Sequence, residues 1–429
     1  MNTHARGISS RWLFPGILAP VVLAVAAGVF LRATANSGAV RNLHLVFHDP
    51  RARAVTVVWN TPHRLERPVV RYHQVSGDDS APCAHAAVAP EIEQPAVALR
   101  DTGSRDWRYR ATLAGLEPGA RYCYRIADSG GAIVDYRAFR SAVRPGEPFT
   151  VLAFGDSRQS KRHRNSPIRR SLADAIGRED LPHLTIFTGD MVDDGSSYRQ
   201  WVQWFADFSP VFERSPLVPV YGNHEAKENK HEVVYYRFFP SPGGGRWFSL
   251  DYGNLHLVVL NTEVPYSASP WSMWQEQARW FAQDMERAAA RPDILWRVVA
   301  CHKPPYSTGH HAVEKDSRDV QRHLPPLFDA HGVDLVLSAH DHYYQRSYPL
   351  RNGRVTDRSA SVYRNPRGVM YLVTAGAGAP LTHGAPAEWV AKYREAYHYC
   401  LIAFGPGREL VITATDINGD LIERVRIVK

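Results

Sequence analysis

Two patterns of hydrophobic and polar positions divide the chain. In residues 40–143, short runs rich in Val, Tyr and Thr alternate with turn residues such as Glu117-Pro118-Gly119. Runs of this composition, bounded by Gly and Pro clusters, predict short strands. The pattern therefore predicts an all-β N-terminal sandwich, followed by a linker at residues 144–148.

After Phe149, apolar strands alternate with stretches of helical character, which predicts an α/β domain over residues 148–429. Helices are expected at residues 166–177, 197–208, 273–289 and 320–331. Strand-like runs return at residues 369–380, 397–405 and 409–416, so the sheet is expected to be mixed. A second sheet packed on the first would account for the number of strands.

Five predicted strands of this second region end in the same way. Each apolar run ends in Gly or Ala, with Cys301 intervening in one case, and then reaches a side chain able to bind a metal: Asp156, Asp190, Asn223 with His224, His302, and His340 with His342. An Asp after a strand is usually a turn residue, and Asp194 is interpreted in that way. The requirements of a turn do not explain why a small residue and a metal-binding side chain follow five different strands. Because loops converge at the carboxyl ends of strands, we expect these side chains to meet in one crevice.

The donor types indicate the chemistry of that crevice. Carboxylate, amide and imidazole ligands suit Fe, Mn or Zn. The number of ligands exceeds what one catalytic ion needs, so two ions roughly 3.5–4 Å apart, joined by a bridging carboxylate, are the economical interpretation. Two such ions activate water as hydroxide and hold the oxygens of a phosphoryl group.

The ordered motif GD, GD, GNHE, VxxH and HxH resembles the signature of calcineurin-like metallophosphoesterases. The preceding strand region, with its GLEPGARYCYRI segment, resembles the fibronectin-III-like domain of purple acid phosphatases. The resemblance covers the chain from about Val40 onward. It implies a four-layer αββα sandwich with two mixed sheets after the N-terminal sandwich.

The resemblance also implies a role for each motif residue. Asp156 and His342 would bind the first metal, Asp190 would bridge both metals, and Asn223, His302 and His340 would bind the second. Asn223 would also contact the substrate. His224 would lie outside the metals as the catalytic residue that binds the phosphate and assists the leaving oxygen.

Three positions depart from the family pattern. Asp193 occupies the position of the tyrosine that binds iron(III) in purple acid phosphatases, and Arg158 occupies the position of a histidine common in other relatives. The first metal therefore lacks one familiar ligand, which Asp193 or water would supply. Arg158 either binds the substrate phosphate or forms a nearby ion pair. Ala339 replaces a Gly, which should be tolerated, and His310 and His311 receive no firm role.

The N-terminus carries basic residues, an uncharged run from Leu13 to Leu31, and the small-residue site Ala33-Thr34-Ala35. This pattern predicts a signal peptide within residues 1–36, with a retained membrane anchor at residues 13–31 as the alternative. Both place the folded protein outside the cytoplasm, secreted or periplasmic.

Cysteine usage and charge add two expectations. Cys83 and Cys123 lie in one predicted domain and are candidates for pairing, whereas Cys301 and Cys400 lie in apolar runs and are expected as buried thiols. The net charge of +8 is spread along the chain, so a solvated basic surface is expected rather than a nucleic-acid groove.

These observations predict an extracytoplasmic dinuclear metallohydrolase that attacks small phosphorylated substrates with a metal-activated hydroxide. Phosphomonoesters are the favoured substrates. A phosphodiesterase acting on nucleotides or lipid head groups is the alternative. A binding protein that has lost one metal is a third hypothesis, because the first-metal ligand set is altered at Arg158 and Asp193.

The position of Asp193 leads to a spectroscopic prediction. Without a tyrosine ligand, iron-loaded protein should lack tyrosinate-to-iron(III) charge transfer and should not be purple. The visible absorption spectrum of the oxidised, iron-loaded protein is the measurement. The substitution Asp193→Tyr is the matched comparison, and a purple wild-type protein would contradict the assignment.

Overall fold

The computed structural model describes residues 40–76, 83, 87–88, 90–100, 104–158, 165–180, 182–226, 232–265, 269 and 272–429. The expected signal peptide or anchor within residues 1–36 lies outside the described residues. In the described ranges, no helix is both long and apolar enough to cross a membrane. Residues from Val40 onward form one compact unit.

The N-terminal region consists of strands, as the hydrophobic pattern predicts. One layer has the antiparallel order β1-β2-β7-β6, and the facing layer has the order β4-β3-β8-β9 with β5 paired to β3. The strands are β1 (Arg41–Val46), β2 (Val55–Thr61), β3 (Val69–Ser76), β4 (Ala87–Val88), β5 (Ile92–Pro95), β6 (Val97–Arg100), β7 (Trp107–Leu113), β8 (Arg121–Asp128) and β9 (Gly131–Arg140). A disulfide joins Cys83 to Cys123, whereas Cys301 and Cys400 are buried free thiols, as expected.

The C-terminal region is an α/β fold with two mixed sheets, which confirms the predicted architecture. The first contains β20 (Val362–Arg364), β25 (Leu421–Val428), β24 (Glu409–Asp416), β23 (His398–Phe404), β10 (Phe149–Phe154), β11 (Leu184–Phe187) and β12 (Leu217–Pro219), in that order. The second contains β13 (Phe248–Tyr252), β14 (Leu255–Val259), β15 (Trp296–Ala300), β16 (Leu335–Ser338), β21 (Met370–Thr374), β17 (Tyr344–Ser347) and β22 (Val390–Arg394). A separate pair, β18 (Leu350–Arg351) and β19 (Arg354–Val355), completes the described strands.

The two regions share a sheet. Strand β1 pairs in parallel with β12 through Val46 and Leu217. The first C-terminal sheet and the layer β1-β2-β7-β6 therefore form one continuous sheet that runs from β20 to β6. One apolar core also contains residues from both regions, including Leu45 and Trp59 from the first and Leu257 from the second. The domain boundaries near residues 143 and 148 remain a prediction from the sequence.

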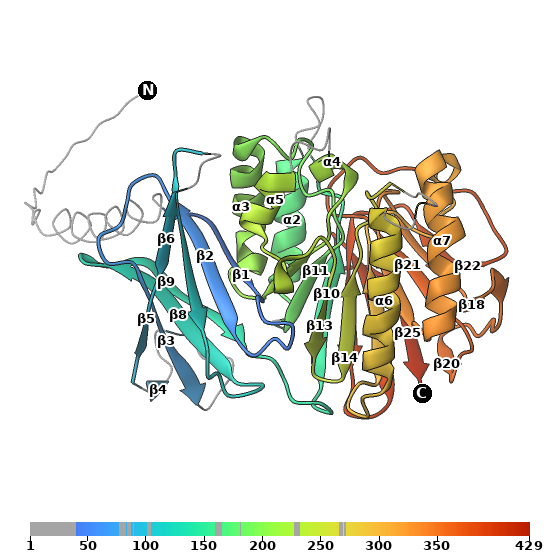
Figure 1. Ribbon diagram of the computed structural model, residues 1–429, viewed down its shortest axis with the longest axis horizontal. Helices are drawn as coiled ribbons and strands as arrows, with labels where there is room; N and C mark the ends of the chain where they lie inside the picture. Colours follow the sequence, from blue (N-terminus) through green and yellow to red (C-terminus); the bar gives the residue numbers. More distant parts are fainter. Residues whose placement is uncertain are drawn as a thin grey trace, which may run out of the picture. The chain divides into compact units, whose positions relative to one another are not determined.

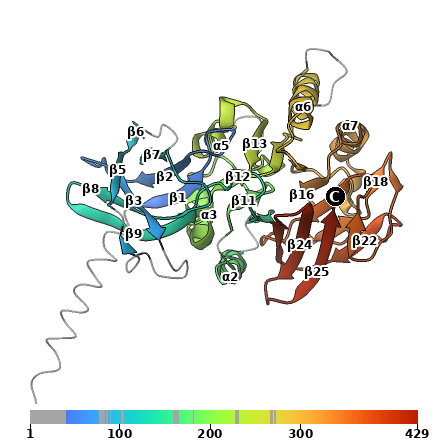
Figure 2. The ribbon, with the colours of Figure 1, turned by 90° about the horizontal axis from the view of Figure 1, so that it is seen from below.

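Helices cover the outer faces of both C-terminal sheets (Figures 1 and 2). Helices α2 (Ser166–Ile176), α3 (Tyr198–Phe212) and α5 (Glu232–Phe238) share a core with the first sheet. Helices α6 (Met273–Ala289) and α7 (Lys315–His331) share another with the second. The short helix α4 (Asn223–Ala226) lies at the end of β12.

The helix predictions differ from the structure mainly at their ends. Helix α6 has its predicted bounds, but α3 continues to Phe212 and α7 begins at Lys315, earlier than expected. The apolar periodicity of α7 begins only at Val320, because the preceding turn is mostly polar. Its internal Pro325 and Pro326 and the Pro210 of α3 do not end the helices.

A buried histidine connects α6 to the edge of the second sheet. His256 Nδ1 lies 2.7 Å from Asp251 Oδ1 on β13, and His256 Nε2 lies 3.0 Å from Asp284 Oδ2 on α6. Burial alone would lower the pKa of His256, but the hydrogen bonds to both carboxylates and their charges outweigh it and raise the pKa above 6.5. Both ring nitrogens can therefore donate, as two acceptors require.

Replacing His256 by Phe should destabilise the protein by about 2–4 kcal/mol, because two carboxylates lose their shared donor. Because folding raises the pKa of His256, the protonated ring contributes its full stabilisation of the folded protein below pH 6.5, the ordinary pKa. This contribution is lost as the pH rises through the folded-state pKa. Urea unfolding at pH 5.5 and pH 8.5 is the measurement, and the deficit should be larger at pH 5.5. The exposed His63→Phe is the control, and a deficit independent of pH would refute the linkage.

Candidate metal centre

Five strand ends bring the predicted ligands together at the top of the view in Figure 1, near α4. Strands β10, β11 and β12 belong to the first sheet, and β15 and β16 to the second. His302 Nε2 lies 3.3 Å from Asp190 Oδ1 and 3.0 Å from Asn223 Oδ1. Ligand atoms of Asp190, His302 and His340 all lie within 4.8 Å of one another. This group joins both sheets.

A second pair lies beside this group. His342 Nε2 is 3.2 Å from Asp156 Oδ1, and the backbone N–H of His340 donates to Asp156 Oδ2 at 2.8 Å. The backbone N–H of Ser157 donates to the carbonyl of Asp190 at 3.0 Å, which connects the two loops. The six predicted metal ligands thus lie in one connected cluster.

Backbone carbonyls orient two of the imidazoles. His302 Nδ1 lies 2.9 Å from the carbonyl of Thr188, and His342 Nδ1 lies 2.6 Å from the carbonyl of Pro380. Because a carbonyl only accepts, Nδ1 carries the proton in both rings. Each Nε2 therefore faces a carboxylate with its lone pair available to a metal.

The backbone is left-handed at three of the predicted ligands, and close packing explains the glycine that precedes two of the ligands. Asp156, Asp190 and His340 have φ of 58°, 54° and 73°, a left-handed conformation that costs free energy in residues other than Gly. At Gly189, a Cβ would lie 2.5 Å from His302 Nδ1, and at Gly222, a Cβ would lie 2.4 Å from Asp190 Oδ1. Tight packing against the ligands, rather than turn formation alone, requires glycine at both positions.

The chemistry of the cluster fits cations. Among the described residues, Asp156 Oδ1 and His340 Nε2 are buried without a hydrogen-bond partner, and such atoms are costly unless a ligand satisfies them. Burial, followed by the charge of His302, keeps the pKa of His340 well below its usual value, so its ring is neutral. Neutral imidazole and carboxylate are the forms that bind Fe, Mn or Zn.

His224 lies beside the cluster rather than within it. Its Nδ1 is 2.9 Å from the carbonyl of Asp193, and its Nε2 is 3.7 Å from Asp190 Oδ2. Its backbone N–H donates to Asp190 Oδ1 at 3.0 Å. The partly exposed ring therefore faces the open side of the cluster, where a substrate would approach.

Arg158 and Asp193 lie at the same side. Arg158 Nε is 3.9 Å from Asp190 Oδ2, and Arg158 Nη1 is 3.9 Å from Asp193 Oδ1. The neighbouring Asp194 accepts hydrogen bonds from the backbone N–H and the hydroxyl of Ser196, the turn arrangement expected for it.

Glu225, in the GNHE motif, has a role that was not predicted. Its buried carboxylate accepts backbone N–H groups from Asp190 at 2.9 Å and Gly222 at 3.1 Å through Oε2, and from Met191 at 2.9 Å through Oε1. Burial, followed by the charge of Asp190, raises the pKa of Glu225 above its ordinary value. The sequence shows Glu225 as part of the GNHE motif, but the role of its carboxylate depends on hydrogen bonds between two loops.

His311, which received no role from the sequence, packs against His340 with ring centroids 4.2 Å apart and the ring planes tilted by 33°. Its Nδ1 lies 2.8 Å from Glu314 Oε1. The buried Asp341 accepts from the hydroxyl of Ser307 and from the backbone N–H of His311. The loop from 307 to 311 is thereby held beside the metal cluster.

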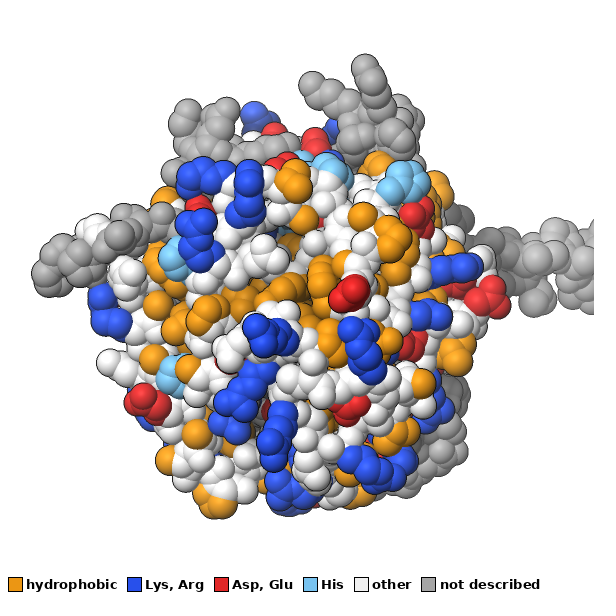
Figure 3. Space-filling view, turned by 90° about the vertical axis from the view of Figure 1, so that its right-hand side faces the viewer, with side chains coloured by type: hydrophobic (Ala, Val, Ile, Leu, Met, Phe, Trp, Pro, Cys, Tyr) orange, Lys and Arg blue, Asp and Glu red, His pale blue; other side chains and the backbone are white. Residues whose placement is uncertain are grey.

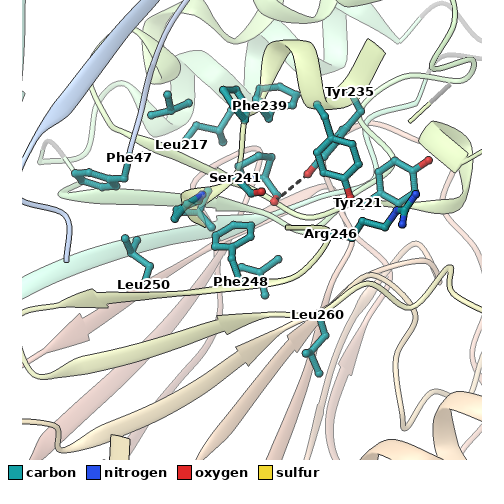
Figure 4. Close-up of a pocket in the computed structure, with 17 residues that line it drawn as sticks. Phe47, Leu217, Tyr221, Tyr235, Phe239, Ser241, Arg246, Phe248, Leu250 and Leu260 are labelled. Atoms are coloured by element: carbon teal, nitrogen blue, oxygen red, sulfur yellow. Dashed lines mark hydrogen bonds between the residues drawn. The ribbon is translucent and has the colours of Figure 1, made fainter. Parts of the chain in front are cut away.

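A separate apolar cavity does not belong to this centre. It has a volume of about 20 Å³ and lies between the two sheets, lined by residues such as Leu217, Phe248 and Leu250 (Figure 4). Tyr221 in its wall precedes the GNHE motif. The cavity is too small for a phosphorylated substrate, so it is a packing gap in the core.

Comparison with known proteins agrees with the motifs. Residues 149–344 match the family model "Calcineurin-like phosphoesterase", and residues 40–141 match "Purple acid Phosphatase, N-terminal domain". Acid phosphatase type 7 of Homo sapiens is 29% identical over 349 residues, covering 75% of this chain and 77% of the human protein. Its mouse (Mus musculus) counterpart is 28% identical over 351 residues, covering 75% and 77%.

The fold has a similar match. The structure of purple acid phosphatase PPD1 from yellow lupin (Lupinus luteus) seeds superposes with a TM-score of 0.74 at 20% identity, covering 91% of this chain and 74% of the lupin chain. The family-model matches and the acid phosphatase relatives identify the chain as an acid phosphatase-like metallophosphoesterase. It is purple acid phosphatase-like, with the N-terminal domain of that group preceding a calcineurin-like metallophosphoesterase domain.

The position of Glu225 leads to a prediction about metal binding. Glu225→Gln replaces one acceptor oxygen with an N–H donor facing backbone N–H groups, so the Asp190 loop should shift. We expect a stability loss of about 1–3 kcal/mol and less bound metal per chain. Thermal unfolding and metal analysis are the measurements. Glu276→Gln, at an exposed position of α6, is the control, and full metal content in Glu225→Gln would contradict the role.

Proposed function

We propose that this protein is an extracytoplasmic, dinuclear metal-dependent phosphomonoesterase. The observation that carries the proposal is the cluster of predicted ligands at five strand ends, with His302 within 3.3 Å of Asp190 and 3.0 Å of Asn223. Asp156 and His342 would hold the first ion, Asn223, His302 and His340 the second, and Asp190 both. Fe, Mn and Zn all suit these donors.

When bound, two such ions supply Lewis-acid activation of water and of the phosphoryl group. The protein's own groups bind and orient the substrate. Arg158, at the open side, would hold phosphate oxygens through its guanidinium, and Asn223 would contact the phosphate through its amide. The net charge of +8 favours the approach of an anionic substrate to the molecule as a whole. Figure 3 shows Lys and Arg outnumbering acidic side chains on the side of the molecule that is at the right in Figure 1.

His224 would assist the leaving oxygen. Because its Nδ1 donates to the carbonyl of Asp193, Nε2 can donate a proton only when the ring is doubly protonated. Transfer of that proton to the leaving oxygen is general acid catalysis.

The location outside the cytoplasm rests on two features. The disulfide between Cys83 and Cys123 fits an extracellular protein, because such bonds persist in oxidising compartments. The N-terminal pattern of a basic start, an uncharged run and small residues is that of an export signal.

Replacing Asp190 by Asn or His302 by Ala should reduce hydrolysis of p-nitrophenyl phosphate by about a thousandfold or more, because several kcal/mol of transition-state stabilisation is lost. Asp180→Asn, exposed and preceding β11, and His63→Ala are the matched controls. Circular dichroism confirms folding. Unchanged activity in either cluster variant would overturn the proposal.

A bis(p-nitrophenyl) phosphate assay run in parallel separates the two ester classes. A higher kcat/KM for the monoester supports the proposal. A higher value for the diester would establish the phosphodiesterase alternative instead.

A further inference from the structure

The two proposed metal positions have unequal sets of protein donors. The position of Asn223, His302 and His340 has three donors of its own, whereas that of Asp156 and His342 has two. Asp190 is shared between them. This difference between the two positions rests on the proposed dinuclear function.

Arg158 lies beside the shared carboxylate of Asp190, and its charge reaches His342 of the poorer position. Its Nε and Nη1 are each 3.9 Å from a carboxylate oxygen, of Asp190 and Asp193 respectively. Its Nε is buried and has no hydrogen-bond partner among the described residues. Its charge acts on both Asp190 and His342. The guanidinium thus faces the shared carboxylate without forming a hydrogen-bonded ion pair with it.

A guanidinium cannot act as a metal ligand, because it has no available lone pair and stays protonated at every physiological pH. A cation at Asp156 and His342 would bind close to this fixed positive charge. In a partly buried site, repulsion at such distances is only weakly screened.

We propose that Arg158 makes the two metal positions unequal, so that the Asp156–His342 position binds its ion weakly until a phosphate anion binds beside the guanidinium. Phosphate can accept two parallel hydrogen bonds from Arg158, and its negative charge offsets the repulsion. Because coupling between two bound ligands is reciprocal, the ion and the anion each strengthen the binding of the other. The poorer position is then filled fully only when a phosphate group is present.

The test is titration of metal-free protein with Mn²⁺, with unbound Mn²⁺ counted by electron paramagnetic resonance, in the absence and presence of inorganic phosphate. Wild-type protein should bind two ions with dissociation constants that differ about tenfold or more. Phosphate should tighten only the weaker one. In Arg158→Met, the weaker constant should fall by about tenfold without phosphate, and the phosphate effect should disappear.

Arg158→Lys retains the charge and is the matched control, which should keep both the difference between the constants and the effect of phosphate. Arg158→Gln is a second neutral variant in case the Met variant folds poorly. Two ions of equal affinity in wild-type protein, or a weaker constant unchanged in both neutral variants, would overturn this inference alone. A single bound ion under every condition would overturn the dinuclear function itself, and this inference with it.

Discussion

The face-to-face packing of the two C-terminal sheets is the constraint on which the candidate metal centre depends. Fully buried residues of the first sheet, such as Ile186, share one apolar core with residues of the second, such as Leu337. Burial of this surface fixes the separation of the sheets and the relative heights of their strands. Strand ends that belong to different sheets can then place ligands within hydrogen-bond distance of one another.

The centre accordingly has little freedom to adjust. Asp190 lies between the two sheets, with its backbone N–H bound by Glu225 and its carboxylate near His302. Its left-handed backbone, like those of Asp156 and His340, carries a cost of about 1–3 kcal/mol. Such conformations persist only where the surroundings hold them. The hydrogen bonds to Glu225 and the tight fit of the neighbouring glycines provide that hold.

Much of the fold could be predicted from hydrophobic patterns, because they reflect which residues one element buries. Helix α6 and the strands before Asp156 and Asp190 were identified in this way. The five repeated strand ends also predicted which side chains lie together. The pairing of β1 with β12, the hydrogen bonds of Glu225 and the ring contact between His311 and His340 could not be predicted. Each depends on residues distant in the sequence and on loop conformations that local patterns do not determine.

Because one sheet runs through both regions, the C-terminal region depends on the N-terminal strands to cover its edge. Without the N-terminal strands, β12 would become an unprotected sheet edge, and α3 would lose the apolar surface of Val46 and Val58 on which it packs. Exposed edges of this kind promote association between chains. The N-terminal region therefore covers this edge, and a fragment beginning at Phe149 would be prone to aggregate even though it contains every predicted metal ligand.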